Sequence, residues 1–342
     1  MVACKLSIKK IFDRIERDDK FEEFKITCGL TPSDEMDSTK FAANFYKSPV
    51  VNYKGKVTGS KDLYSEVIAE TLINDNFIKD WLNLMPERPE HFKINHPNTD
   101  KNVDALKITN RKEEILAKLL FYQGNVDGLG YIFDYQTPLK KTRNDSYGKI
   151  DLLGYNTDDE CYSVIELKYR PSGSEETLLR CILEAYTYYK LLDINQIKSA
   201  VGHDGIQKLK ELSGYKHTNE SELVVLFDEK SCAKDDGGAE TNLMLRIVSN
   251  EPDDPNNYPS KTVVSQQYKE CQELINPSKR KELRALCEAI LKQESKLKQI
   301  RFVVLRADTD SKSSYPTNIK GWSRKLDRLY RAETLLTIPR KG

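Results

Sequence analysis

Residues 148–169 read GKIDLLGYNTDDECYSVIELKY, two mostly apolar runs joined by a polar cluster. The cluster, NTDDE, is typical of a tight turn, so the stretch predicts a β-hairpin. Three charged residues interrupt the apolar runs: Asp151, Glu166 and Lys168. Burying an ionised side chain is costly unless another group compensates its charge. These charges therefore either lie on a solvated face of the sheet or surround a metal ion.

The length of the turn sets which residues of the two strands face one another. With a loop at Thr157–Glu160, Asn156 pairs with Cys161 and, counting back, Asp151 lies opposite Glu166. Residues in directly opposed positions share a face of the sheet, with Cβ atoms about 5 Å apart. Alternation along the second strand then assigns side chains to faces: Val164, Glu166 and Lys168 share the face of Asp151, and Ile165 and Leu167 enter the other.

Two opposed carboxylates in a partly dry site repel one another unless a cation lies between them. Mg²⁺ prefers such oxygen ligands and keeps bound waters that can act as nucleophiles. A lysine two residues beyond the second carboxylate can contact the same water or the charge that develops on a phosphodiester under attack. The alternative is that Asp151, Glu166 and Lys168 only cover the solvated face of a half-exposed sheet, because E-x-K is a frequent pattern.

The chain divides into three parts by its pattern of apolar and turn residues. We expect a mainly helical N-terminal region over 1–104, an alternating helix–strand core over 105–232 and a C-terminal α/β extension over 233–342 that stands apart or continues the core sheet. The core elements expected are a helix at 108–123, strands at 131–139, 149–155 and 161–169, a helix at 175–192 and a strand at 223–228. Elsewhere we expect amphipathic pieces at 6–24 and 61–85, strands at 243–248 and 300–305, and helices at 279–298 and 319–329.

The hairpin and the order of the elements around it resemble the PD-(D/E)xK nuclease superfamily, the restriction-endonuclease-like fold of many restriction enzymes, Holliday-junction resolvases and DNA-repair nucleases. GKIDLLG and SVIELKY are similar to the G-x-I-D-L-L and V-I-E-L-K pattern of some members. Ile150 departs from the proline in the motif's name. The resemblance covers roughly residues 105–230 and implies an α/β fold in which helices flank a mixed central sheet in the order αβββαβ.

The resemblance implies roles for the residues of the hairpin. Asp151 and Glu166, together with Leu167, are expected to hold Mg²⁺ or Mn²⁺, and Lys168 is expected to be the catalytic lysine. Members of the superfamily often add an acidic residue on the first core helix. The sequence RKEEILAKLLFYQ offers two candidates for this catalytic and metal-binding position, Glu113 and Glu114.

Helical periodicity separates these two candidates. Glu113 lies in line with Leu116 and Leu120 at the edge of the apolar stripe, where the helix faces the sheet. Glu114 points farther out and has Lys118 at i+4, the spacing of an exposed ion pair. Glu113 is therefore preferred. The alternative is that both carboxylates only solubilise the first turns of the helix.

On the helix after the hairpin, Arg180, Glu184 and Tyr188 recur at i, i+4 and i+8 and share one face. Some members of the superfamily carry Gln-x-x-x-Tyr here, near the metal, and Glu184 would replace the glutamine. The simpler interpretation is a surface ion pair between Arg180 and Glu184 beside an aromatic core edge; the alternative is that all three contact nucleic acid. Further basic residues near the proposed site could also contact phosphates: Lys140, Lys141, Arg143 and Arg170.

The composition of the chain limits the partners, metals and cellular compartment that we expect. The net charge of the 342-residue chain is +1, so a nucleic-acid footprint would be local. The 7 cysteines show no C-x-x-C spacing and the 4 histidines form no H-E-x-x-H pair, which argues against a zinc site and for reduced thiols in the cytoplasm. The sequence has no apolar run of about 18 residues, so we expect no membrane partner.

These expectations combine into a Mg²⁺-dependent endo- or exodeoxyribonuclease of restriction, phage defence or DNA repair. DNA is favoured over RNA only because the members of the superfamily that the chain resembles commonly act on DNA. Substrate specificity stays open, as do a homodimer and a partner protein of a defence or repair system. The competing interpretation is a nucleic-acid-binding module that has the same fold but does not cleave. A third is an unrelated α/β scaffold with charged strands.

Overall fold

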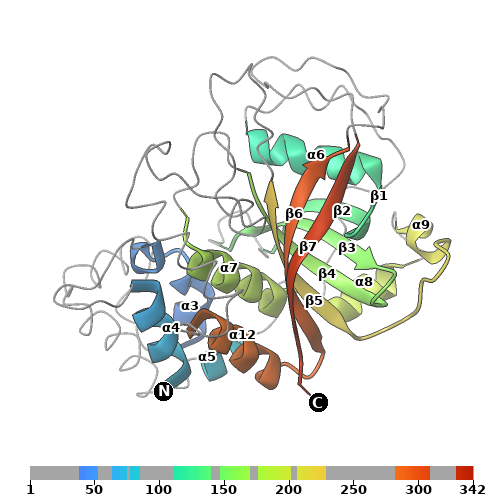
Figure 1. Cartoon of the computed structure of the whole chain (residues 1–342). Coiled ribbons are helices and arrows are strands. Elements are labelled where there is room, and N and C mark those ends of the chain that lie inside the picture. Colours follow the sequence, from blue (N-terminus) through green and yellow to red (C-terminus); the bar gives the residue numbers. More distant parts are fainter. Residues whose placement is uncertain are drawn as a thin grey trace, which may run out of the picture.

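The structure is a computed structural model that describes residues 38–52, 64–74, 78–84, 111–139, 147–169, 176–201, 206–228, 282–308 and 329–341. A seven-stranded sheet follows chain order from β1 to β7 (Figure 1). Its strands are β1 (Asn125–Val126), β2 (Gly130–Pro138), β3 (Lys149–Asn156), β4 (Cys161–Lys168), β5 (Ser221–Asp228), β6 (Leu297–Ala307) and β7 (Tyr330–Pro339). Neighbouring strands are antiparallel from β1 to β4, parallel from β4 to β6, and antiparallel between β6 and β7.

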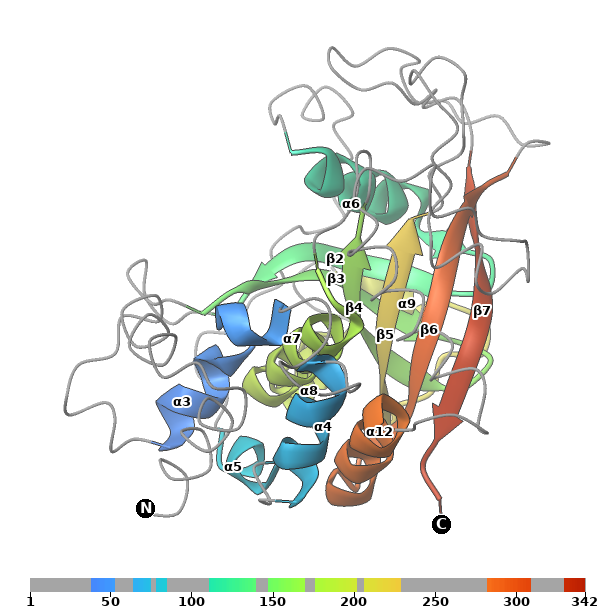
Figure 2. The same ribbon diagram turned by 60° about the vertical axis from the view of Figure 1, so that its left-hand side comes forward.

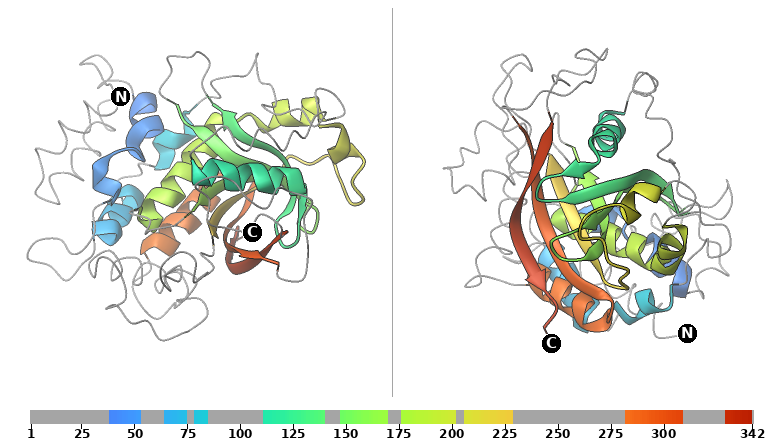
Figure 3. Two further views of the ribbon diagram at one scale, coloured as in Figure 1. Left: turned by 90° about the horizontal axis from the view of Figure 1, so that it is seen from above. Right: turned by 90° about the vertical axis from the view of Figure 1, so that its right-hand side faces the viewer.

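Helices flank both faces of this sheet. They are α3 (Ser38–Phe45), the 3-10 helix η2 (Pro49–Asn52), α4 (Tyr64–Asn74), α5 (Ile78–Leu82), α6 (Lys112–Gln123), α7 (Leu178–Leu191), α8 (Ile194–Ala200), α9 (Gln207–Lys210) and α12 (Glu282–Gln293). The N-terminal helices α3 to α5 gather around α7 and α12 and share one apolar core with them and with one face of the sheet (Figure 2). Helix α6 packs on the other face, over a second apolar core (Figure 3). No helix within the described ranges is long and apolar enough to cross a membrane.

The hairpin has the register expected from its turn. Residues 157–160 form the turn and Asn156 pairs with Cys161, as predicted. The backbone ladder continues to the pair Leu152–Ile165, one step short of Asp151 and Glu166. Val164 belongs to the apolar core under α7, whereas Ile165 and Leu167 belong to the core under α6. The predicted assignment of alternate side chains to the two faces is therefore confirmed.

The predicted order of core elements is confirmed as well. Helix α6, the meander β2–β3–β4, helix α7 and strand β5 occur in the predicted order, with the short β1 between α6 and β2 and with α8 and α9 between α7 and β5, and β5 runs parallel to β4. The fold is thus α/β, with a mixed sheet flanked by helices. Strands β6 and β7 continue the same sheet, and a bridge between Asp127 and Arg331 brings its two edges together. The sheet is therefore almost closed on itself.

The C-terminal part departs from the prediction in two places. The helix expected over 279–298 ends at Gln293, and Leu297 already begins β6, because pairing with β5 outweighs the helical propensity of a charged run. Strand β7 was not predicted: its exposed positions carry charged and polar residues typical of an edge strand. The strand expected at 243–248, the piece at 6–24 and most of the helix at 319–329 lie outside the described residues.

Candidate active site

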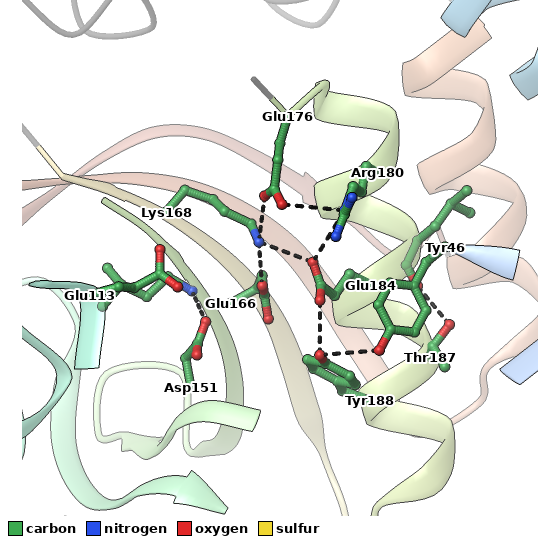
Figure 4. A network of polar contacts seen from close by, with 12 residues as sticks. Tyr46, Glu113, Asp151, Glu166, Lys168, Glu176, Arg180, Glu184, Thr187 and Tyr188 are labelled. Atoms are coloured by element: carbon green, nitrogen blue, oxygen red, sulfur yellow. Dashed lines mark hydrogen bonds and ion pairs between the residues drawn. The ribbon is translucent and has the colours of Figure 1, made fainter. Parts of the chain in front are cut away.

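The charged residues of the hairpin lie around a cavity of about 690 Å³ where β4 ends. Figure 4 shows the central residues of this site and the contacts that join them. The lining comes from β2, β3, β4 and the segments around α6 and α7: Arg111, Glu113, Glu114, Gln136, Lys149, Asp151, Glu166, Lys168, Tyr169, Glu176, Glu184 and Tyr188. Four residues predicted from the sequence, Asp151, Glu166, Lys168 and Glu113, therefore line the same cavity.

Asp151 is buried, and two donors hold its carboxylate. Oδ2 accepts a hydrogen bond of 3.0 Å from the Leu167 backbone N–H, and Oδ1 accepts one of 2.8 Å from Gln136 Nε2. Burial, reinforced by the charge of Glu113, raises the pKa of the Asp151 carboxyl to about 8. Gln136 was not identified from the sequence. It sits at φ 50° within β2, a left-handed conformation unusual for a non-glycine residue.

Glu166 is buried beside Asp151 and is only half satisfied. Its Oε1 accepts a hydrogen bond of 2.5 Å from Lys168 Nζ, whereas Oε2 has no hydrogen-bond partner among the described residues. Burial raises the pKa of Glu166 well above its usual range, and the negative charges of Asp151 and Glu184 add to this shift. A buried carboxylate oxygen without a partner calls for an explanation, such as a cation.

Lys168 is held by three carboxylates at once. Its Nζ lies 2.5 Å from Glu166 Oε1, 2.8 Å from Glu176 Oε2 and 3.0 Å from Glu184 Oε2 (Figure 4). Burial acts to lower the pKa of the lysine, but the charges of Glu166 and Glu184 outweigh it and hold that pKa well above its ordinary value. The ammonium group therefore stays charged and has a set position.

The simpler interpretation of Glu184 as a surface residue is wrong. Glu184 is buried and contacts Lys168, and Arg180 Nε lies 4.0 Å from Glu184 Oε2. Burial opposes its ionisation, but Lys168 and Arg180 outweigh burial and lower the pKa of Glu184. The i, i+4, i+8 spacing correctly placed these residues on one face of α7, but periodicity does not tell which way that face points.

A chain of hydroxyl groups supports Glu184 from behind. Tyr188 Oη donates to Glu184 Oε1 at 2.8 Å, and Tyr46 Oη lies 3.3 Å from Tyr188 Oη. Since the single proton of Tyr188 goes to the carboxylate, Tyr46 donates to Tyr188. Tyr46 follows α3, so the N-terminal region reaches the site through this contact. A glycine is required at position 148, beside these hydroxyl groups, because a Cβ there would lie 2.3 Å from Tyr188 Oη.

Tyr188→Phe is expected to lower the free energy of unfolding by about 1–2 kcal/mol, because it removes the only proton that Tyr188 gives to a buried carboxylate and leaves the Tyr46 hydroxyl without its acceptor. Tyr46→Phe, the matched variant, removes only the outer hydroxyl and should cost less. Urea denaturation of both variants measures the difference. Equal costs for the two variants would contradict the inferred direction of the chain.

The two candidates on α6 differ in their contacts. Glu113 Oε2 accepts a hydrogen bond of 3.1 Å from the Tyr169 backbone N–H, just past the end of β4, and burial raises the pKa of Glu113. Glu114 forms the expected ion pair with Lys118, at 3.6 Å. Both line the cavity, but Glu113 is the one that contacts the hairpin and acts on the charge of Asp151.

The remaining basic residues divide into two groups. Arg180 does not line the cavity itself, but its Nε is 3.3 Å from Oε1 of Glu176, which does. The other four predicted nucleic-acid contacts lie outside the described residues: Lys140, Lys141, Arg143 and Arg170. Three further residues of the site were not predicted: Gln136, Glu176 and Tyr46. Each is a single polar residue, and no local sequence pattern indicates which distant side chain such a residue contacts.

The donor set fits a hard divalent cation. No group of three His, Cys, Asp or Glu side chains within the described ranges is arranged as a complete metal site. Mg²⁺ needs no such group, since it keeps several waters and binds through one or two carboxylates. Asp151 and Glu166 offer these oxygens: burial, and after it neighbouring negative charge, raises the pKa of both, and Glu166 Oε2 lacks a partner among the described residues. Leu167 directly follows Glu166 in sequence, and its backbone N–H donates to Asp151.

The three described cysteines, at positions 161, 181 and 287, are free thiols.

Comparison of the chain with models of known protein families, with curated proteins and with solved structures finds no match. The function of the cavity must therefore be inferred from its own residues, its charge and its geometry.

Proposed function

We propose that this protein is a metal-dependent nuclease that hydrolyses phosphodiester bonds of nucleic acid, with a core of the PD-(D/E)xK type. The observation that carries the proposal is the convergence of Asp151, Glu166 and Lys168 in one cavity, with Glu113 beside them. The element order α6–β2–β3–β4–α7–β5, with β5 parallel to β4, is the order that the restriction-endonuclease-like resemblance implies. The order of these core elements therefore supports the proposal that the local motif suggests.

The charge balance of the cavity supports a role for a divalent cation. Among its described lining residues, six are acidic and only three, Arg111, Lys149 and Lys168, are basic. A phosphodiester is an anion, so such a surface weakens its binding unless cations offset the carboxylates. Mg²⁺ or Mn²⁺ at Asp151 and Glu166 would offset this repulsion, so the excess of carboxylates is consistent with a nuclease that needs a metal.

The residues of the site would then have separate roles in the hydrolysis. When bound, Mg²⁺ acidifies a coordinated water and neutralises charge on the phosphate. Asp151 and Glu166 would hold the metal, and the two hydrogen bonds to Asp151 fix the direction of its carboxylate. Lys168 keeps its charge and, held by Glu184, can donate to the oxygen on which negative charge develops. Glu113 ties down the end of β4 through Tyr169.

The non-catalytic alternative is less well supported by the site. A module that only binds nucleic acid gains nothing from buried carboxylates, because they repel phosphate. Uncompensated burial of Asp151 and Glu166 also costs folding stability, as their raised pKa values indicate. DNA is preferred over RNA from the resemblance alone, and restriction, phage defence and DNA repair are the settings it implies.

The test is cleavage of a panel of single-stranded, duplex, branched and modified DNA, and of RNA, with Mg²⁺ or Mn²⁺. We expect cleavage of at least one substrate, its loss on addition of EDTA, and its loss in Asp151→Asn. Calorimetry checks that the metal is bound. An intact panel in the presence of bound metal would favour the binding module instead.

A further inference from the structure

Glu176 occupies a bridging position between two cations at the mouth of the site. It lies one residue before Thr177, the N-cap of α7. Its Oε2 is 2.8 Å from Lys168 Nζ and its Oε1 is 3.3 Å from Arg180 Nε. Each carboxylate oxygen thus contacts a different positive group, as Figure 4 shows.

Glu176 is the least enclosed of the three carboxylates around Lys168. Its side chain is 26% exposed, against 4% for Glu166 and 9% for Glu184. Its contact with Arg180 is also imperfect: Arg180 Nε is buried, yet it has no hydrogen-bond partner of good geometry among the described residues. Glu184 therefore contacts both cations from the buried side, while Glu176 contacts them from a partly exposed position.

A phosphate group could take the place of the Glu176 carboxylate between the two cations. A phosphodiester carries one negative charge over two non-bridging oxygens, so it can bridge a lysine and an arginine as Glu176 does, and charge-assisted hydrogen bonds of this kind are among the strongest in proteins. The positive end of the dipole of α7, a helix of 14 residues, lies at the same place. Three features of the chain thus favour an anion here.

We propose that Lys168 Nζ and Arg180 Nε form a subsite for a phosphate of the substrate backbone, and that Glu176 fills this subsite until the phosphate displaces it. The identity of the ligand rests on the proposed function. The subsite itself rests on the bridging contacts, the exposure of Glu176 and the incompletely bonded Arg180. Glu176 then competes within the molecule with any incoming phosphate and weakens its binding.

The test needs neither metal nor cleavage. In EDTA, inorganic phosphate and a thymidine dinucleotide, which carries one phosphodiester, are titrated against the wild type and Glu176→Ala and followed by NMR. Glu114→Ala is the matched control: it removes the same charge from the same cavity, but Glu114 pairs with Lys118 and not with Lys168. Glu176→Gln repeats the measurement with a side chain of nearly unchanged size, in case the alanine variant does not fold.

We expect Glu176→Ala to bind both probes at least about tenfold more tightly than the wild type, the gain of one charge-assisted contact. Glu114→Ala should change binding much less, and adding Arg180→Ala to Glu176→Ala should abolish the gain. Equal gains in the two single variants would overturn the proposal, because they would show only a general change of field. A gain for inorganic phosphate alone would overturn its assignment to the substrate backbone.

The outcome is separable from that of the nuclease test. Tighter binding of the dinucleotide without cleavage of any substrate would support the subsite and contradict the proposed catalysis. Cleavage without tighter binding in Glu176→Ala would support the nuclease and contradict the subsite.

Discussion

Lys168→Ala is expected to reduce metal-dependent cleavage by on the order of 10²- to 10³-fold, the loss seen when one preorganised electrostatic contact is removed from an active site. The ammonium group interacts more strongly with the charge of the transition state than with the ground state, so the rate suffers more than the affinity. Single-turnover kinetics on a cleaved substrate measures the rate. Metal affinity should stay within a few-fold of the wild type, and nucleic-acid affinity should fall by about tenfold, far less than the rate, because Lys168 also belongs to the proposed phosphate subsite.

The contacts of Lys168 add a second expected effect. Without the ammonium group, the buried carboxylates of Glu166 and Glu184 lose their shared partner, and breaking a buried ion pair in this way costs about 3–5 kcal/mol. Lys168→Arg is the matched variant, because it keeps the charge but changes its geometry. It should recover most of the stability and little of the cleavage. Full cleavage by Lys168→Ala under conditions where it is folded would exclude the lysine from catalysis.

Asp151→Asn is expected to abolish the binding of Mg²⁺ or Mn²⁺, and with it cleavage, while leaving the fold intact. The amide keeps an oxygen for the Leu167 N–H but lacks the charge that a hard divalent cation requires. Because the raised pKa keeps the Asp151 carboxyl protonated in the metal-free protein below about pH 8, a neutral amide of the same size should leave the metal-free variant at least as stable as the wild type. Isothermal titration calorimetry measures the metal affinity; equal affinities would remove Asp151 from the ligand set.

The same variant tests the raised pKa of Asp151. The carboxyl has a pKa of about 8 in the folded protein against 3.8 in its ordinary state, so the folded chain holds this proton more tightly than the unfolded chain. The resulting stability is fully present below about pH 4 and is lost as the pH rises to about 8, by up to about 1.4 kcal/mol per pH unit.

Urea denaturation in EDTA between pH 5 and 9 therefore separates the two proteins. The wild type should lose stability with rising pH, and Asp151→Asn should lose it less steeply. Some slope should remain in the variant, because the pKa values of Glu166 and Glu113 are raised as well. Identical slopes would show that Asp151 is ionised in the metal-free protein at neutral pH.

Local sequence was sufficient to predict the hairpin and the face of the sheet that carries its charged residues. The cluster NTDDE determined the loop length, the loop length determined the pairing of Asn156 with Cys161, and strict alternation then assigned side chains to faces. The apolar stripe of α6 likewise distinguished Glu113 from Glu114. These inferences succeeded because the turn and the helical and strand periods are properties of a few neighbouring residues.

Contacts between distant elements were decided only by the tertiary structure. Glu184 was placed on the correct face of α7, but packing of that face against β4 and the N-terminal region turned it from an expected surface residue into a buried partner of Lys168. The roles of Tyr46, Gln136 and Glu176 depend on the same packing. A one-dimensional pattern records which side of an element is apolar; the partner that a polar residue on that side contacts depends on how elements far apart in the chain pack together, which no local period encodes.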